Sequence, residues 1–179
     1  MKLGFVALAL ALTLGAVAPA QQEPAPVKVS KLATPQKALK FEVVVPAKAA
    51  EVWTAFTTAE GLKTWLWKDC TVDLRPGGGW TVHYPGGATG GGTIVSIDAG
   101  RQIVIHAMAP EKFPEVRRIG TTATFDFQPE GDNTRVTLTQ TGWKEGKEWD
   151  DAYDYLAQGN AQLLGQLYRR FKSGPLKWQ

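Results

Sequence analysis

Cysteine and histidine are scarce in this sequence, which has one Cys and two His among its 179 residues. A single Cys excludes an intrachain disulfide and a zinc cluster built on cysteines, and two histidines are too few to replace them. No Ser, Cys or carboxylate can be assigned as the partner of either histidine, so the sequence predicts no catalytic triad. We therefore expect no metal site and no cofactor.

Positive charge is not concentrated anywhere in the chain. Lys and Arg together number 20 against 17 Asp and Glu, and no run of basic residues is longer than two. Nucleic-acid binding requires a surface that neutralises several phosphates, which dispersed charges of both signs do not form. We therefore expect no nucleic-acid partner.

The first 20 residues have the composition of an export signal. Lys2 precedes an uncharged, largely apolar stretch over residues 3–18, and the small residue Ala20 follows shortly after it. A basic start, an apolar stretch and small residues before a cut are typical of a cleaved secretory signal peptide. The stretch is shorter than the ~20 residues that cross a bilayer. We predict cleavage after Ala20, no membrane association of the mature protein, and export to the periplasm or the medium.

The rest of the chain has the length of a single domain. Residues 21–36 contain three prolines and no aromatic residue. Such a segment cannot bury a core of its own, so we predict a flexible tether. The folded domain is predicted over residues 37–179.

Hydrophobic periodicity predicts the elements of this domain. Apolar and polar residues alternate from Leu39 to Val45, which indicates a half-buried strand, and two short helical segments follow at 49–56 and 58–66. Apolar residues then recur at helical spacing over 147–171, with Asn160 among them. Six more strands are predicted between these helices, at residues 70–75, 80–84, 93–98, 102–108, 121–128 and 135–141, with an irregular loop over 109–120.

This order of elements predicts an α+β fold. Seven antiparallel strands joined mostly by short turns form one sheet, and the long C-terminal helix has one apolar face. The sheet buries that face by curving around the helix. A cavity can remain between them, and the sequence leaves open whether side chains or a ligand fill it.

Five segments of the chain together resemble the SRPBCC superfamily, and within it the branch that includes the C-terminal domain of the activator of Hsp90 ATPase. They are residues 51–66 (EVWTAFTTAEGLKTWL), 76–80 (PGGGW), 91–98 (GGTIVSID), 134–139 (TRVTLT) and 149–155 (WDDAYDY). The resemblance implies a helix-grip fold, similar to lipid-transfer START domains, with a hydrophobic cavity under the long helix. An exported chain meets neither cytosolic Hsp90 nor ATP, so we do not carry ATPase activation over to it.

We therefore expect an exported, non-catalytic protein that binds a hydrophobic, lipid-like or aromatic small molecule in this cavity. Two alternatives stay open. One is a cyclase- or hydrolase-like enzyme that acts on such a ligand with His106 as its base. The other is an envelope chaperone-like or interaction protein, which requires a broad exposed apolar patch. The sequence does not determine the oligomeric state.

Six residues are candidates for the cavity lining, with ordinary core packing as the alternative for each. Aromatic rings make good walls for apolar ligands, and the aromatic candidates fall on elements that the predicted fold brings together. The predicted lining is Trp65, Cys70, Trp80, His106, Trp149 and Tyr153.

The glycine-rich stretch over residues 85–92 invites comparison with a phosphate-binding loop. No helix follows it, and no Lys-Ser or Lys-Thr pair closes it, so oriented backbone N–H groups for an anion are missing. We predict a hairpin turn that forms part of the cavity rim.

Overall fold

The computed structural model describes residues 26–178, and residues 1–25 and 179 are not described. The predicted signal peptide, residues 1–20, therefore lies outside the described residues. Between residues 26 and 178, no helix has both the length and the apolar character that crossing a membrane requires.

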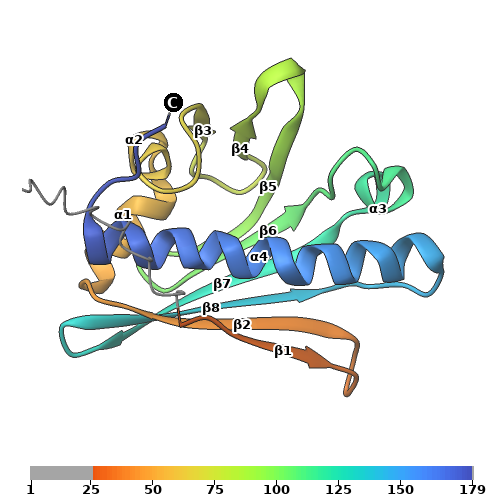
Figure 1. Cartoon of the computed structure of the whole chain (residues 1–179), viewed down its shortest axis with the longest axis horizontal. Helices are drawn as coiled ribbons and strands as arrows, with labels where there is room; N and C mark the ends of the chain where they lie inside the picture. The colour runs from red at the N-terminus through yellow and green to blue at the C-terminus, as the bar shows by residue number, and fades with distance from the viewer. Residues whose placement is uncertain (1–25, 179) are drawn as a thin grey trace, which may run out of the picture.

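The described residues form one antiparallel sheet and a long helix that lies across one of its faces (Figure 1). The order of the strands in the sheet is β1-β2-β8-β7-β6-β5-β4-β3. The predicted α+β, helix-grip architecture is confirmed, with eight strands in place of seven. The strands are β1 (Lys28–Leu32), β2 (Ala38–Val45), β3 (Cys70–Val72), β4 (Gly79–His83), β5 (Thr89–Asp98), β6 (Gln102–Ala107), β7 (Thr121–Glu130) and β8 (Asn133–Thr141).

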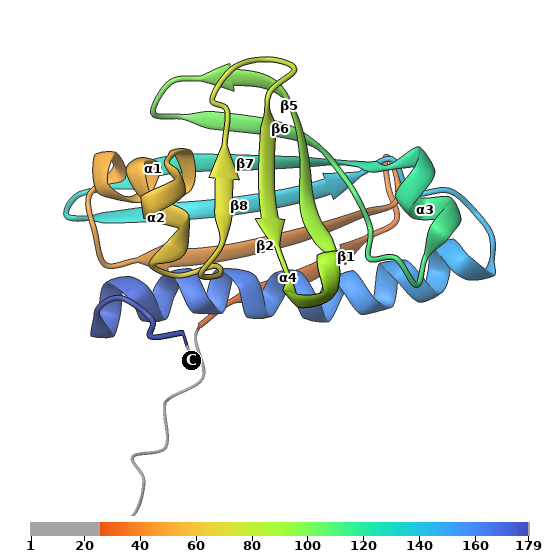
Figure 2. The same cartoon turned by 90° about the horizontal axis from the view of Figure 1, so that it is seen from above.

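Within residues 26–178, four α-helices accompany the sheet, together with one short 3-10 helix at Pro85–Gly87. The long helix α4 (Lys147–Ser173) runs along the sheet, with α1 (Ala49–Thr57) and α2 (Ala59–Lys63) at one end. The short α3 (Pro114–Ile119) lies at the other end, beside the start of α4, as Figure 2 shows from above. The helix predicted over 147–171 is thus present and slightly longer.

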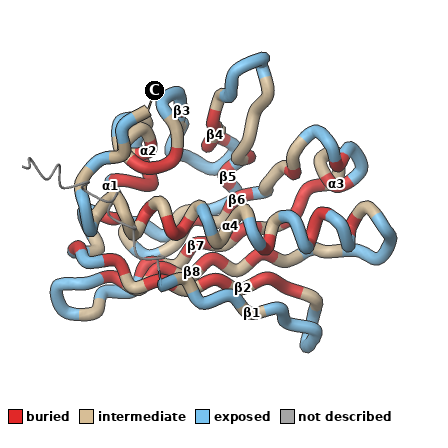
Figure 3. Tube along the Cα trace, viewed as in Figure 1, coloured by how far each residue is buried: buried red, intermediate tan, exposed pale blue. Residues whose placement is uncertain are grey.

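Alternation along the strands places the core between the sheet and the helices. In β2 the side chains of Leu39, Phe41 and Val43 are buried, whereas those of Lys40 and Glu42 are only partly buried. Strands β7 and β8 show the same period of two. Figure 3 shows buried positions recurring along these strands and along α4.

Two parts of the chain differ from the sequence-based prediction. The predicted tether over 21–36 is wrong for residues 28–32, which form the edge strand β1 paired with β2. Its side chains are mostly exposed, so the strand is held by backbone pairing and its composition resembles that of a linker. The segment predicted as an irregular loop over 109–120 contains the helix α3. At its N-terminus, the backbone N–H groups of Glu115 and Val116 donate to the Glu148 carboxylate at 2.7 and 3.0 Å.

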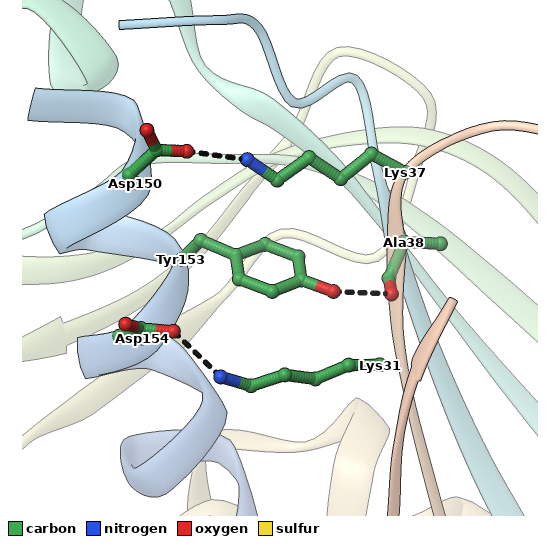
Figure 4. A network of polar contacts seen from close by, with 6 residues as sticks. All are labelled: Lys31, Lys37, Ala38, Asp150, Tyr153 and Asp154. Carbon is green, nitrogen blue, oxygen red and sulfur yellow. Dashed lines mark hydrogen bonds and ion pairs between the residues drawn. The ribbon is translucent and has the colours of Figure 1, made fainter. Parts of the chain in front are cut away.

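Polar contacts join β1, the β1–β2 connection and β2 to the start of α4 (Figure 4). The Tyr153 hydroxyl donates to the backbone carbonyl of Ala38 at 2.9 Å. Ion pairs flank this hydrogen bond on both sides, namely Lys37–Asp150 and Lys31–Asp154, each at 2.6 Å. Exposed ion pairs contribute only about 0–1 kcal/mol each, so the buried tyrosine ring and its hydrogen bond provide most of this attachment.

Candidate functional site

A cavity of about 370 Å³ lies between the middle of α4 and the sheet. Its walls are mainly apolar. Strands β4, β6, β7 and β8 supply Trp80, Ile105, Ala107, Ala123, Phe125, Leu138 and Gln140. Helix α4 supplies Tyr155, Leu156, Gly159, Asn160 and Leu163, the start of β5 supplies Thr89, Gly90 and Gly91, and two connecting segments supply Tyr84, Ala88, Met108, Pro110 and Glu111.

Trp80 is fixed as part of the wall by a buried hydrogen bond. Its indole Nε1 donates to the backbone carbonyl of Phe56 at 2.8 Å, and the residue is 4% exposed. Gly91 on the paired strand β5 has φ of +98°, and a Cβ there would lie 2.0 Å from the Trp80 carbonyl oxygen. Only glycine permits this close approach of β5 to β4.

Helix α4 lacks a side chain at one of the positions that face the cavity. Leu156, Gly159, Asn160 and Leu163 recur every three or four residues and so share one face of α4. A Cβ placed on Gly159 meets no atom within 4 Å. The missing side chain at this position therefore contributes to the volume of the cavity.

One polar cluster interrupts the apolar lining. Gln140 Nε2 donates to Thr121 Oγ1 at 2.8 Å, and Asn160 Nδ2 donates to Gln140 Oε1 at 2.8 Å. Gln140 is 4% exposed, so these bonds satisfy an amide that would be costly to bury alone.

The rim of the cavity is formed by the exposed lining residues Tyr84, Glu111 and Tyr155. The Lys112 ammonium lies 3.4 Å above the centre of the Tyr155 ring. The Arg117 guanidinium of α3 joins the start of β5 to the segment that follows β6, because it donates to Thr89 Oγ1 and to the backbone carbonyls of Thr89 and Ala109. The predicted hairpin between β4 and β5 is present, but its turn covers only residues 85–88, and residues 89–92 already belong to β5.

The model of one protein family matches most of this folded region. It is described as Activator of Hsp90 ATPase homolog 1-like protein, and it matches residues 46–172. The chain belongs to this family. The match includes α1 to α3, strands β3 to β8 and all of α4 except its last residue. The Activator of Hsp90 ATPase homolog 1-like region therefore contains every residue that lines the cavity.

Several solved structures share the fold of this chain, although their sequences are only distantly similar to it. Protein MLL2253 from Mesorhizobium loti has a TM-score of 0.65 and 15% identity, covering 78% of this chain and 99% of that one. The Aha1 dimer from Colwellia psychrerythraea has a TM-score of 0.63 and 20% identity, covering 76% and 97%. CalU16 from Micromonospora echinospora has a TM-score of 0.58 and 19% identity, covering 87% and 88%. No curated protein matches this chain.

The sequence predicts six residues for the cavity lining. Of these six, Trp80 is the one that lines the cavity in the structure. Trp65 is fully buried against Phe56, with ring centroids 4.8 Å apart, and donates to the Ala55 carbonyl at 2.9 Å. Cys70 lies in the same main core, where its thiol donates to the Trp67 carbonyl at 3.2 Å. Both side chains fill the core between α1, α2 and the sheet.

The other three predicted residues also lie outside the lining. Trp149 belongs to a small second core with Phe113 and Val116, under α3. Tyr153 packs on β2, two residues of α4 before Tyr155, which is the first helix residue of the lining. His106 is exposed, since the buried Ile105 beside it takes the inward position of β6. An enzyme that uses His106 on a ligand in this cavity is not supported by this geometry.

Sequence reasoning missed the polar cluster, although its signal was present. Asn160 falls on the apolar face of the predicted helix, and Gln140 alternates inward with Val136 and Leu138. A polar residue at an inward position must find a partner. That partner here is another polar residue, 20 positions away in the chain, which spacing along the chain could not identify.

The buried thiol makes a testable contribution to the pH dependence of stability. Burial raises the pKa of Cys70 from 9.0 to about 11. The folded state then holds the thiol proton more tightly than the unfolded state, so this stabilisation is complete below pH 9 and is lost as the pH rises through about 11. We expect the melting temperature to fall more steeply over this interval in the wild type than in Cys70→Ala. Parallel profiles for the two proteins would contradict this role.

Proposed function

We propose that this chain is an exported protein that holds a hydrophobic or aromatic small molecule in the cavity under α4, without transforming it. The observation that carries the proposal is the 370 Å³ cavity, with mainly apolar walls and one polar cluster. Ligand sites typically measure about 300–1,000 Å³ and combine apolar walls with a few oriented polar groups. The size favours a small ring compound over a large lipid.

The cavity lining lacks an assembled catalytic group, which supports the proposal that the protein does not transform its ligand. Among the described residues that line the cavity there is no His, Cys, Lys or Ser, and the titratable groups are the Glu111 carboxylate and the Tyr84 and Tyr155 phenols, all at the rim. General acid–base catalysis requires a titratable group within hydrogen-bond reach of the reacting atoms. These exposed groups at the rim are better explained by contact with solvent than by catalysis on a ligand inside the cavity.

The distribution of exposed apolar residues favours a ligand site over a chaperone-like surface. The large exposed hydrophobic residues of the described region are scattered: Val29 and Leu32 share β1, whereas the others lie on four different segments, namely Leu74, Tyr84, Val95 and Tyr155. Only two of them, Tyr84 and Tyr155, share a place at the cavity rim. A broad apolar patch is the feature that a chaperone-like protein requires.

Export is proposed from the first 20 residues alone. The basic Lys2, the apolar stretch after it and the small residue Ala20 satisfy the requirements of a signal peptide. N-terminal sequencing of the protein purified from its source should find Gln21 as the first residue. A mature protein that still begins at Met1 would refute export through this signal.

Binding can be tested with N-phenyl-1-naphthylamine, a neutral apolar probe whose emission rises in a dry pocket. We expect saturable binding of one probe per chain, with quenching of tryptophan emission because Trp80 lies in the wall. Several weak sites per chain would instead indicate a surface patch. No binding of this probe or of a panel of neutral aromatic compounds would refute the proposed function.

A further inference from the structure

The amide side chains of Gln140 and Asn160 determine which polar group of a ligand can form a hydrogen bond in the cavity. Asn160 uses its Nδ2 to donate to Gln140, and Gln140 uses its Nε2 to donate to Thr121. Both amides line the cavity, whereas Thr121 is 4% exposed and lies behind them. In this arrangement the Asn160 Oδ1 atom has no hydrogen-bond partner among residues 26–178.

This chain of hydrogen bonds can also run in the opposite direction. An amide has an acceptor at one end and a donor at the other, and a hydroxyl is both. If both amides turn over, the Thr121 hydroxyl donates to Gln140 Oε1, and Gln140 Nε2 donates to Asn160 Oδ1. Both hydrogen bonds are kept, and the cost of reversal is therefore small. The free group of Asn160 then changes from an acceptor oxygen to an N–H donor.

Charge restricts the ligand further. No Lys, Arg or His is among the described residues that line the cavity, and the only ionisable carboxylate there is at the rim. An ion beside the amide pair would lose its hydration without gaining an opposite charge, which costs far more than burying a neutral polar group.

We propose that this amide pair is an adaptable polar site, which accepts a hydrogen-bond donor or an acceptor on an otherwise apolar, uncharged ligand. The inference rests on the proposed function, because it concerns the same cavity. It assigns the ligand to the neutral ring compounds with one hydroxyl, N–H or carbonyl group.

Three bicyclic probes of similar size separate these possibilities. Indole offers only an N–H donor, 1-indanone only a carbonyl acceptor, and indene neither. We expect wild-type protein to bind indole and 1-indanone with dissociation constants within about threefold of each other. In Gln140→Leu/Asn160→Leu, both polar probes should bind roughly 3- to 10-fold more weakly, while indene binds at least as well. Replacing both amides together avoids leaving one of them buried and unpaired.

A second variant tests the reversal itself. Once its carboxyl has ionised, at a pH that partial burial raises above that of a free aspartate, Asn160→Asp presents only acceptor atoms, and Gln140 must turn over to donate to the new carboxylate. Binding of indole should persist, whereas binding of 1-indanone should weaken by roughly tenfold or more, since two acceptors then face each other. Gln162→Glu introduces the same charge at an exposed position of α4 and should leave both affinities unchanged. Circular dichroism of each variant checks that the fold is retained.

The outcomes distinguish this inference from the proposed function. A wild type that prefers one polar probe over the other by more than tenfold, or a double leucine variant that binds all three probes like the wild type, overturns the adaptable site. In either case binding of indene and of N-phenyl-1-naphthylamine still supports a ligand cavity. If none of these compounds binds, the proposed function itself fails.

Discussion

Gly159→Phe is expected to weaken the binding of N-phenyl-1-naphthylamine by roughly 10- to 100-fold while leaving the protein folded. Gly159 lines the cavity, and apart from the neighbouring backbone of α4 no atom lies within 4 Å of a Cβ placed on it. An aromatic side chain there can occupy the volume that a ligand needs without displacing backbone. Because glycine is a poorer residue for a helix interior than phenylalanine, its replacement also removes a helix penalty of about 0.5 kcal/mol.

The matched control for this variant is Gln162→Phe, which adds the same side chain to an exposed position of α4. It should bind the probe like the wild type. Fluorescence titration gives both affinities, and thermal melting verifies that neither variant is unfolded. Equal affinities for Gly159→Phe and the control would mean that the probe binds elsewhere.

Phe56→Ala is expected to lower the free energy of unfolding by about 3–5 kcal/mol, the range typical of a large aromatic side chain removed from a core. Phe56 is fully buried, and its ring centroid lies 4.8 Å from that of Trp65 and 4.9 Å from that of Phe127. The rings of Phe125 and Trp80 lie at 5.2 and 6.5 Å. Since Phe56 joins α1 to the sheet, the vacated space cannot close without moving an element.

Urea denaturation measures this effect, with Phe171→Ala as the matched control. Phe171 is only partly buried near the end of α4, so losing the same side chain there should cost markedly less. A Phe56→Ala loss below that of the control would show that the aromatic core does not depend on Phe56. The variant also matters for binding, because the Phe56 carbonyl accepts the hydrogen bond that orients Trp80 in the cavity wall.

The residues that sequence reasoning placed well are those whose environment follows from local periodicity. Leu39, Phe41 and Val43 alternate and are buried, as a half-buried strand requires. The edge strand β1 was missed for the converse reason. Its residues are mostly exposed, so its sequence lacks an apolar face, and only backbone pairing with β2 reveals it.

The cavity lining shows where that reasoning stops. Periodicity along α4 correctly identified Trp149 and Tyr153 as buried, but a helix of 27 residues contacts different partners along its length. Its first turns pack on α3 and β2, and only the turns from Tyr155 to Leu163 lie over the cavity. The spacing of apolar residues identifies which face of a helix is buried. It does not identify which other element covers that face at each turn.

The sequence by itself determined the α+β class, the order of most elements and the family, because these depend on hydrophobic periods and motifs that are local in the chain. Only the tertiary structure decided that Gln140 and Asn160 meet, that Trp80 alone of the six predicted residues lines the cavity, and that His106 lies outside it. These facts depend on how far strands and helices that are distant in the chain approach one another. Packing across the whole domain sets that approach, and no local pattern encodes it.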